Sequence, residues 1–259
     1  MAHGSPRADY DAIAPFYDSG PGRAKAVDPE LLAFLENRAS SDAPWLLDIA
    51  CGTGNQLIAN RAAVPEANMV GVERSSGMLR QAWQKSRNIA WVQADAAALP
   101  FPAASFDFIS CQFAIHHFQD KAGMLREAFR VLRPGGRFAL RNLCPQESSD
   151  WLYYEYFPEA QRADLRDFWP PAAVVASMEG IGFATVSMDY EHLHFEQDLA
   201  QWIEIVRRRD TCSQLLAITD TAYEAGLRRL ERELEQGTTP QRRADHLCLL
   251  TIRGDKPCS

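Results

Sequence analysis

The sequence predicts an α/β fold built on a mostly parallel sheet, and two observations support this prediction. From residue 45 onward, short apolar runs alternate with segments of helical periodicity, which is the pattern of βα units around a parallel sheet. The runs are apolar throughout rather than alternating, as expected for strands covered by helices on both faces. The length of 259 residues suits a single elaborated α/β domain with one large core.

Seven apolar runs give the strands, and we expect the last to close the sheet as an antiparallel edge. The predicted strands are Trp45–Ala50, Asn68–Glu73, Ile89–Ala94, Phe106–Phe113, Arg137–Leu143, Phe183–Leu193 and His246–Arg253. The clearest helix between them is Lys121–Leu132, whose apolar residues repeat at helical spacing. The run Pro134-Gly135-Gly136 is expected to stop this helix before the next strand.

Two segments after the fifth strand are predicted to form a helical cap over the carboxyl edge of the sheet. Residues 151–171 are rich in aromatic side chains and too long for a plain connection. Residues 197–240 carry two amphipathic helical stripes, and Thr221 with Glu224 could form a capping box at the start of the second. Both segments follow strands whose carboxyl ends form the ligand-binding edge of an open α/β sheet.

Composition excludes several classes of partner. The chain has 27 Lys and Arg against 34 Asp and Glu, a formal net charge of −7, so we expect no nucleic acid substrate. Its longest apolar stretch falls short of the roughly 20 residues that a membrane span needs. No signal peptide is readable, so the cytoplasm is the expected location. The six cysteines show no C-x-x-C spacing, and we expect reduced thiols and no metal site.

The first strand runs into a glycine turn, LLDIACGTGNQL (46–57), in which Gly52 and Gly54 allow a tight turn and a close ligand approach. A dinucleotide-binding G-x-G-x-x-G turn would have a third glycine where Leu57 stands. Asp48 at the strand end would repel a pyrophosphate, which favours a bare helix N-terminus. The turn therefore favours a nucleoside ligand with a cationic sulfonium or ammonium group.

The ends of the next two strands also carry carboxylates. Glu73 follows Gly54 by 19 residues and is placed to accept both hydrogen bonds of a ribose diol. Asp95 ends the third strand and could accept a hydrogen bond from an adenine amino group. Together with Asp48, these residues put three acids at one edge of the sheet.

Four segments in the same order resemble the motifs of class I S-adenosylmethionine-dependent methyltransferases. These segments are LLDIACGTGNQ, GVERSSGML, VQADAAALPFPAASFDFISCQFAIHHF and REAFRVLRPGGRFAL. The pattern is most similar to the ubiquinone-biosynthesis-type branch, which acts on small molecules. The opening YDAIAPFYD (10–18) resembles that branch's N-terminal motif, which folds over the cofactor. The resemblance covers residues 10–143.

The resemblance implies a Rossmann-like, doubly wound sheet of seven strands with an antiparallel edge strand and a helical cap. It implies a single methyltransferase domain over residues 1–259. The parts expected within it are an N-terminal helical lid at 10–43, a cofactor-binding core at 44–143, and cap insertions at 151–171 and 197–240. The cap is expected to enclose the methyl acceptor.

The resemblance also assigns S-adenosylmethionine to particular residues. The residues so implied are Asp48, Gly52 and Gly54 around the methionine moiety, Glu73 on the ribose, Arg74 and Met78 beside the adenine, Asp95 and Ala96 at its exocyclic edge, Gln112 and His117 in the pocket after the fourth strand, and Tyr17, Ala50 and Asn55 elsewhere in the site. Ala50 departs from the pattern, which usually has glycine there. Alanine is tolerated if its φ is negative.

Catalytic residues are not dictated by the reaction. Methyl transfer from a sulfonium is an in-line displacement with a neutral leaving group, so the enzyme mainly positions and desolvates its substrates. By location, the candidates are His117, His116 and Tyr17. A metal at the histidine pair is disfavoured, because adjacent strand residues face opposite ways and no third ligand is near. We expect one imidazole to face the cofactor cavity and the other to pack or meet solvent.

The function predicted from these observations is transfer of a methyl group from S-adenosylmethionine to a small-molecule acceptor. The nucleophile, O, N, C or S, is left open, and the enzyme is expected to be a monomer or homodimer. A nicotinamide-dependent reductase is one alternative, disfavoured by Leu57 and by the lack of a Tyr-x-x-x-Lys pair. A non-catalytic cofactor-binding protein is the other.

Overall fold

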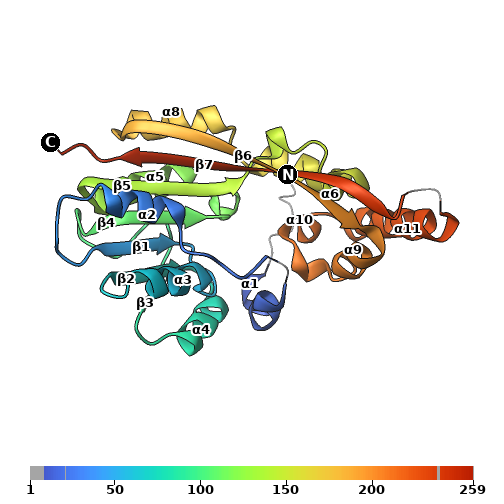
Figure 1. The fold of residues 1–259 in the computed structure, drawn as a ribbon, viewed down its shortest axis with the longest axis horizontal. Coiled ribbons are helices and arrows are strands. Elements are labelled where there is room, and N and C mark those ends of the chain that lie inside the picture. Colours follow the sequence, from blue (N-terminus) through green and yellow to red (C-terminus); the bar gives the residue numbers. More distant parts are fainter. Residues whose placement is uncertain (1–8, 21, 238–239, 259) are drawn as a thin grey trace. The chain divides into compact units, whose positions relative to one another are not determined.

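The computed structural model describes residues 9–20, 22–237 and 240–258, and it contains a seven-stranded sheet with strand order β3-β2-β1-β4-β5-β7-β6 (Figure 1). The strands are β1 (Trp45–Ile49), β2 (Asn68–Glu73), β3 (Ala90–Gln93), β4 (Phe106–Gln112), β5 (Leu132–Leu143), β6 (Ala184–Asp198) and β7 (Arg242–Asp255). The first five pair in parallel. The predicted α/β class with a mostly parallel seven-stranded sheet is confirmed.

Helices connect the strands as the periodicity predicts. The α-helices are α1 (Tyr10–Ile13), α2 (Pro29–Glu36), α3 (Asn55–Ala63), α4 (Ser76–Lys85), α5 (Lys121–Val131), α6 (Leu152–Tyr156), α7 (Pro158–Asp167), α8 (Pro171–Ile181), α9 (Leu199–Val206), α10 (Ser213–Leu216) and α11 (Asp220–Gln236). Short 3₁₀ helices are η1 (Ala14–Ser19), η2 (Ile115–His117), η3 (Pro145–Glu147) and η4 (Arg209–Thr211). Asp28, Ser75 and Asp120 cap α2, α4 and α5 by accepting a backbone N–H.

The antiparallel strand is β7, which lies one position inside the sheet edge. The backbone N–H of Gly135 donates to the carbonyl of Lys256 at 2.8 Å, and that of Cys144 donates to Cys248 at 2.9 Å. Residue numbers therefore rise along β5 while they fall along β7. β6 lies outside β7 and forms the edge of the sheet.

Two local predictions differ from the structure. α5 ends at Val131 and β5 begins at Leu132, so the Pro-Gly-Gly run lies inside the strand. Gly135 at φ 75° still donates its N–H to the carbonyl of Lys256, directly after β7, which explains why the run does not end the strand. The helix α11 is capped by Thr219, whose hydroxyl accepts from the Ala222 N–H, and not by the predicted Thr221.

The chain divides into two compact units. The first, here called the sheet unit, contains residues 10–142 and 171–189 and the chain from Thr251 onward. The second, here called the helical unit, contains residues 143–170 and 190–250. Both predicted cap segments lie largely in the helical unit, whereas the predicted lid and the glycine turn lie in the sheet unit.

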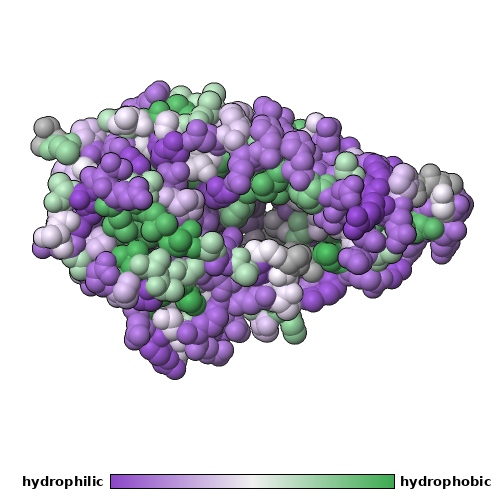
Figure 2. Space-filling model, in the orientation of Figure 1, coloured by the Kyte–Doolittle hydropathy of each residue, from purple (hydrophilic) through white to green (hydrophobic). Residues whose placement is uncertain are grey.

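The core of the sheet unit packs α2 and α3 against one face of the sheet. Its buried members include Leu31, Phe34, Leu46, Leu57, Met69 and Phe108. Burial of each such side chain stabilises the fold by about 1.5–3 kcal/mol. On the visible face, Figure 2 shows hydrophobic residues gathered over α2 and β1, where Leu32 and Trp45 are 38% and 40% exposed.

The helical unit has a separate aromatic core. Its buried members include Tyr153, Tyr154, Tyr156, Phe157 and Trp202. The aromatic-rich segment at 151–171 thus supplies much of the core of its own unit. Figure 2 shows a hydrophilic surface around α11, where Arg228 pairs with Glu224 and Arg229 with Glu233. Within the described residues, no helix combines the length and apolar character needed to cross a bilayer.

Candidate active site

The glycine turn after β1 leaves open space beside its backbone. Gly52 and Gly54 have φ values of 55° and 80°, a left-handed region that favours glycine. A Cβ on Gly54 would lie 2.4 Å from the Trp91 ring, so any side chain is excluded there. A Cβ on Gly52 would meet nothing within 4 Å. Gly52 thus has the backbone conformation of a tight glycine turn, and the turn provides a cradle that a side chain would fill.

Ala50 adopts the conformation that glycine would favour. Its φ is 58°, so the condition of a negative φ, under which alanine would replace glycine without cost, is not met. An L-residue in this region carries about 1–2 kcal/mol of strain. The turn holds it there because the Cys51 N–H bonds the Val72 carbonyl of β2 at 3.0 Å. Strained backbone that the surroundings enforce is common at ligand sites.

Glu73 is fixed at the end of β2 by three backbone donors. One carboxylate oxygen accepts from the Gly52 N–H at 3.1 Å, and the other accepts from Arg74 at 2.8 Å and Ser75 at 2.9 Å. This side chain therefore joins the glycine turn to the end of β2. A carboxylate has about four lone-pair sites, so about one remains to accept a hydrogen bond from a ribose hydroxyl, and not the two that the sequence suggested.

Asp48 is a buried acid at the end of β1. It is 3% exposed, and its carboxylate accepts a hydrogen bond from the Ser110 hydroxyl at 2.8 Å. Burial raises the pKa of Asp48 to about 7, and the Ser110 hydrogen bond opposes that rise. A cationic ligand would favour the ionised carboxylate. Asp48 is therefore suited to a sulfonium or ammonium group.

The residues predicted beside the adenine differ in exposure. Arg74 and Asp95 are exposed, whereas Ala96 is buried and Met78 is only 1% exposed. Asp95 accepts from the Ala97 N–H at 2.8 Å, which fixes the turn after β3. The Met78 side chain is thus covered by protein, while Asp95 is open to a ligand.

The YDAIAPFYD segment is anchored by two acids that the sequence analysis did not single out. Asp11 accepts from the Ser75 hydroxyl at 2.8 Å and from the Gly77 N–H at the start of α4. Asp18 accepts from the Thr53 hydroxyl at 2.6 Å and from Asn55 at 2.9 Å. Asn55, predicted as a cofactor residue, therefore contacts this segment. Both acids lie within the YDAIAPFYD motif, and this motif is the sequence feature that could have indicated them.

Tyr17 belongs to the same segment and lies beneath Arg23. The guanidinium carbon is 3.8 Å from the ring centroid, and the guanidinium donates to the phenol oxygen at 2.8 Å. Burial raises the pKa of Tyr17, and nearby Glu73 adds to this effect. The phenol stays protonated at neutral pH. The Tyr17 side chain is therefore better suited to covering the bound cofactor than to acting as a general base.

Two histidines after β4 pack against each other. They lie in η2 with ring centroids 3.8 Å apart, so the prediction that they face opposite ways is wrong. The prediction assumed strand geometry, and the chain turns instead. The Tyr10 hydroxyl lies 2.7 Å from Nε2 of His117, and burial holds the pKa of His116 well below its usual range. Gln112, at the end of β4, donates to Asp28 at 3.0 Å.

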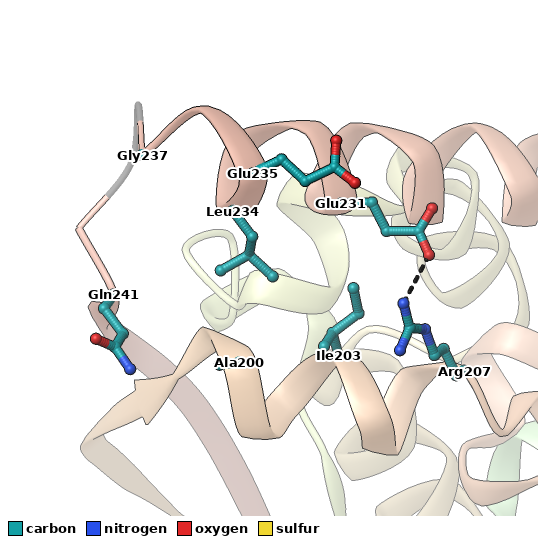
Figure 3. Close-up of a pocket in the computed structure, with 8 residues that line it drawn as sticks. All are labelled: Ala200, Ile203, Arg207, Glu231, Leu234, Glu235, Gly237 and Gln241. Carbon is teal, nitrogen blue, oxygen red and sulfur yellow. Dashed lines mark hydrogen bonds and ion pairs between the residues drawn. The ribbon is translucent and has the colours of Figure 1, made fainter.

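The helical unit contains a cavity of about 480 Å³ between α9 and α11 (Figure 3). It is lined by Ala200, Ile203, Arg207, Glu231, Leu234, Glu235, Gly237 and Gln241. Arg207 and Glu231 form an ion pair at 2.9 Å across it. No predicted cofactor residue lines this cavity. Over the part of the chain that the structure describes, no group of three or more His, Cys, Asp or Glu is arranged to hold a metal ion.

The chain is similar to known methyltransferases. Residues 47–140 match the family model described as a methyltransferase domain. The demethylmenaquinone methyltransferase of Thermus thermophilus is 31% identical over 177 residues, which cover 58% of this chain and 77% of that protein. The malonyl-[acyl-carrier protein] O-methyltransferase of Hahella chejuensis is 32% identical over 139 residues, covering 53% of this chain and 49% of that protein.

A solved structure of similar fold comes from Anabaena variabilis and is described as a methyltransferase of an antibiotic biosynthesis pathway. Its TM-score is 0.65 at 22% identity, with 86% of this chain and 95% of that chain covered. At this identity the likeness concerns the fold alone. It confirms the Rossmann-like arrangement.

The fold, the acids at the carboxyl edge and these relatives define an S-adenosylmethionine-dependent methyltransferase. The chain belongs to the class I family of these enzymes, in a branch similar to that of quinone biosynthesis. Its cofactor is S-adenosylmethionine and its acceptor is a small molecule. The open space beside Gly52 and the buried acid Asp48 fit that cofactor.

Proposed function

We propose that this enzyme methylates a small aromatic acceptor of the quinol type. The observation that carries the proposal is the similarity to a demethylmenaquinone methyltransferase over 77% of that protein's length. A quinol has acidic hydroxyl groups, and its ionised form is a strong carbon or oxygen nucleophile. A carboxylic acid acceptor is the second candidate, supported by the similarity to a malonyl-[acyl-carrier protein] O-methyltransferase.

The proposed roles of the chain's residues follow from their contacts. S-adenosylmethionine, when bound, supplies a methyl group on a positively charged sulfur that leaves as a neutral thioether. Glu73, held by three N–H groups, accepts a hydrogen bond from a ribose hydroxyl. Asp48 carries the charge that offsets the cation. Asp11 and Asp18 hold the N-terminal segment over this site, which excludes water from the reacting atoms.

The location, oligomeric state and partners of the enzyme are also inferred. We infer an enzyme that works in the cytoplasm as a monomer or homodimer, without a nucleic acid partner. The cap role of residues 151–171 and 197–240 stays a prediction. It is checked by hydrogen exchange, which should slow in these segments when cofactor product and acceptor are both present.

A methyl-transfer assay tests the proposed acceptor class. The protein is incubated with S-adenosylmethionine labelled in its methyl group and with a reduced naphthoquinone, a malonyl thioester or an ethanolamine phosphate. We expect label in the naphthoquinol product, at a rate well above that of the Gly52→Val variant. Label only in the malonyl ester would favour the second candidate. Label only in the amine, or in none of the three, would contradict the proposed acceptor class.

A further inference from the structure

Lys25 differs from the other three lysines of the chain. Lys85 donates to a carboxylate, and Lys121 and Lys256 donate to backbone carbonyls. Lys25 is half-buried, yet within the described residues it makes neither a hydrogen bond nor an ion pair. Its ammonium lies over the ring of Phe113, 4.7 Å from the centroid. The three N–H donors of Lys25 are therefore available to a ligand.

The ring beneath Lys25 is held in an unusual position at the end of β4. Phe113 follows this strand directly and has a φ of 53°, which is strained for a bulky side chain. Its N–H donates to the carbonyl of Arg141 in β5 at 2.8 Å. Lys25 therefore lies at the carboxyl ends of β4 and β5.

Four charged groups act on Lys25. Burial and the cations of Arg23 and Arg141 lower the pKa of Lys25, and the carboxylates of Asp48 and Asp28 oppose this. Both acids already accept hydrogen bonds from other residues. Three cations thus meet at one edge of a protein whose net charge is −7. This arrangement favours an anionic ligand.

The strand order separates this position from the nucleoside end of the site. Of the acids assigned to ribose and adenine, Glu73 is the last residue of β2 and Asp95 comes two residues after β3. β1 lies between those strands and β4, and β5 is one strand further away. An anion at Lys25 is therefore on the opposite side of the glycine turn from the ribose. That side is where an acceptor must approach the methyl group.

We propose that Lys25 is a catalytic residue that binds the acceptor as an oxyanion, the ionised hydroxyl of a phenol or quinol. This inference rests on the proposed function, because it names the charge state in which the acceptor reacts. The ring of Phe113 provides an apolar face against which an aromatic acceptor can pack. The ammonium donates to the oxyanion and favours its ionised form.

The reaction balances without a further reactant. The acceptor hydroxyl releases its proton to solvent before transfer. An electron pair of the oxyanion, or of the ring carbon conjugated with it, forms the new bond to the methyl carbon. The carbon–sulfur bond breaks, its electron pair stays on sulfur, and the neutral thioether product results. If ring carbon is methylated, that carbon then loses its proton to solvent and the aromatic ring is restored.

Substitution of Lys25 tests the proposal through the pH profile. Lys25→Met should raise the apparent pKa of kcat/KM by about one unit and lower activity below that pKa about tenfold, because the oxyanion loses its cation. Lys25→Arg should restore most of the activity. Affinity for S-adenosylhomocysteine should not change in either variant. Arg126→Met removes an exposed cation of α5 and serves as the matched control, with an unchanged profile expected.

A binding measurement tests the same point without turnover. The probe is 4-nitrophenol, whose phenolate absorbs visible light, mixed with protein and S-adenosylhomocysteine. Its bound form should ionise about one pH unit lower than free 4-nitrophenol in the wild type and lose this shift in Lys25→Met. Equal shifts in both proteins, or no binding to the wild type, would overturn the proposal.

The two proposals fail in different ways. If no quinol is methylated but 4-nitrophenolate binding still depends on Lys25, the proposed acceptor is wrong and the anion site stands. If a quinol is methylated and Lys25→Met leaves the pH profile unchanged, the role of Lys25 is wrong and the proposed function stands. A lower melting temperature with an unchanged profile would assign Lys25 a structural role and overturn the proposal.

Discussion

Replacement of Asp48 by asparagine should make the enzyme more stable and deprive it of cofactor. Burial raises the pKa of Asp48 from 3.8 to about 7, so the folded state holds this proton more tightly than the unfolded chain does. The stability contribution of the protonated acid is complete below about pH 4. It is lost as the pH rises to about 7. Each pH unit in this range costs about 1.4 kcal/mol, so full ionisation costs on the order of 4 kcal/mol.

Urea unfolding of the cofactor-free protein at pH 5.5 and 8.5 measures this effect. The Asp48→Asn variant avoids the ionisation cost and keeps an oxygen for the Ser110 hydroxyl. Its advantage over the wild type should be about 2 kcal/mol larger at pH 8.5 than at pH 5.5. A matched variant, Asp42→Asn at an exposed acid, should show no such difference. A pH-independent advantage of Asp48→Asn would refute the reasoning.

The same titration predicts how cofactor affinity depends on pH. A cationic ligand favours the ionised carboxylate, so binding releases a proton below about pH 7. Calorimetry should show wild-type affinity for S-adenosylmethionine rising with pH and levelling above that value. The affinity of Asp48→Asn should be at least tenfold lower and nearly independent of pH. Equal affinities at pH 8 would remove Asp48 from the site.

Three further variants test the turn and the N-terminal segment. Gly52→Val should abolish cofactor binding by calorimetry, because the branched side chain is strained at a φ of 55° and fills the open space; native affinity would show that the turn faces elsewhere. Ala50→Gly should raise stability to urea by about 0.5–1 kcal/mol, since it relieves left-handed strain; a loss of stability would contradict that strain. Asp11→Ala should weaken S-adenosylhomocysteine binding several-fold and speed hydrogen exchange in residues 10–19, because this segment loses its anchor at the start of α4. If the wild type and Asp11→Ala showed identical exchange in residues 10–19 with S-adenosylhomocysteine bound, the result would argue against this anchor.

Most strands and the glycine turn could be predicted from the sequence, because their signals are local. β2 has the predicted bounds, β1 and β4 are one residue shorter at their carboxyl ends, and β3 is one residue shorter at each end. β5, β6 and β7 are longer than predicted, since their ends pair with distant strands through contacts that apolar periodicity does not record. The Pro-Gly-Gly run shows this, because a ladder bond from Gly135 keeps it in β5.

The site residues that lie at the carboxyl ends of strands could be predicted from the sequence. Asp48 is the penultimate residue of β1, Glu73 is the last residue of β2, and Asp95 comes two residues after β3, as expected. Asp11 and Asp18 were missed because their partners lie more than 30 residues away. Lys25 was missed because a lone lysine carries no motif, and its position over Phe113 depends on how the segment before α2 folds back on the sheet.

The most direct test of the central claim is calorimetric titration of S-adenosylhomocysteine into the wild type and the Glu73→Ala variant. The claim is that the carboxyl edge of the sheet unit binds the cofactor, with Glu73 holding its ribose. Removal of this charged acceptor should weaken binding by about 1.5–3 kcal/mol. Because Glu73 also accepts three backbone N–H groups, melting curves must show that the variant is folded at the titration temperature. A folded Glu73→Ala protein with wild-type affinity, or a wild type that binds no S-adenosylhomocysteine, would contradict the claim.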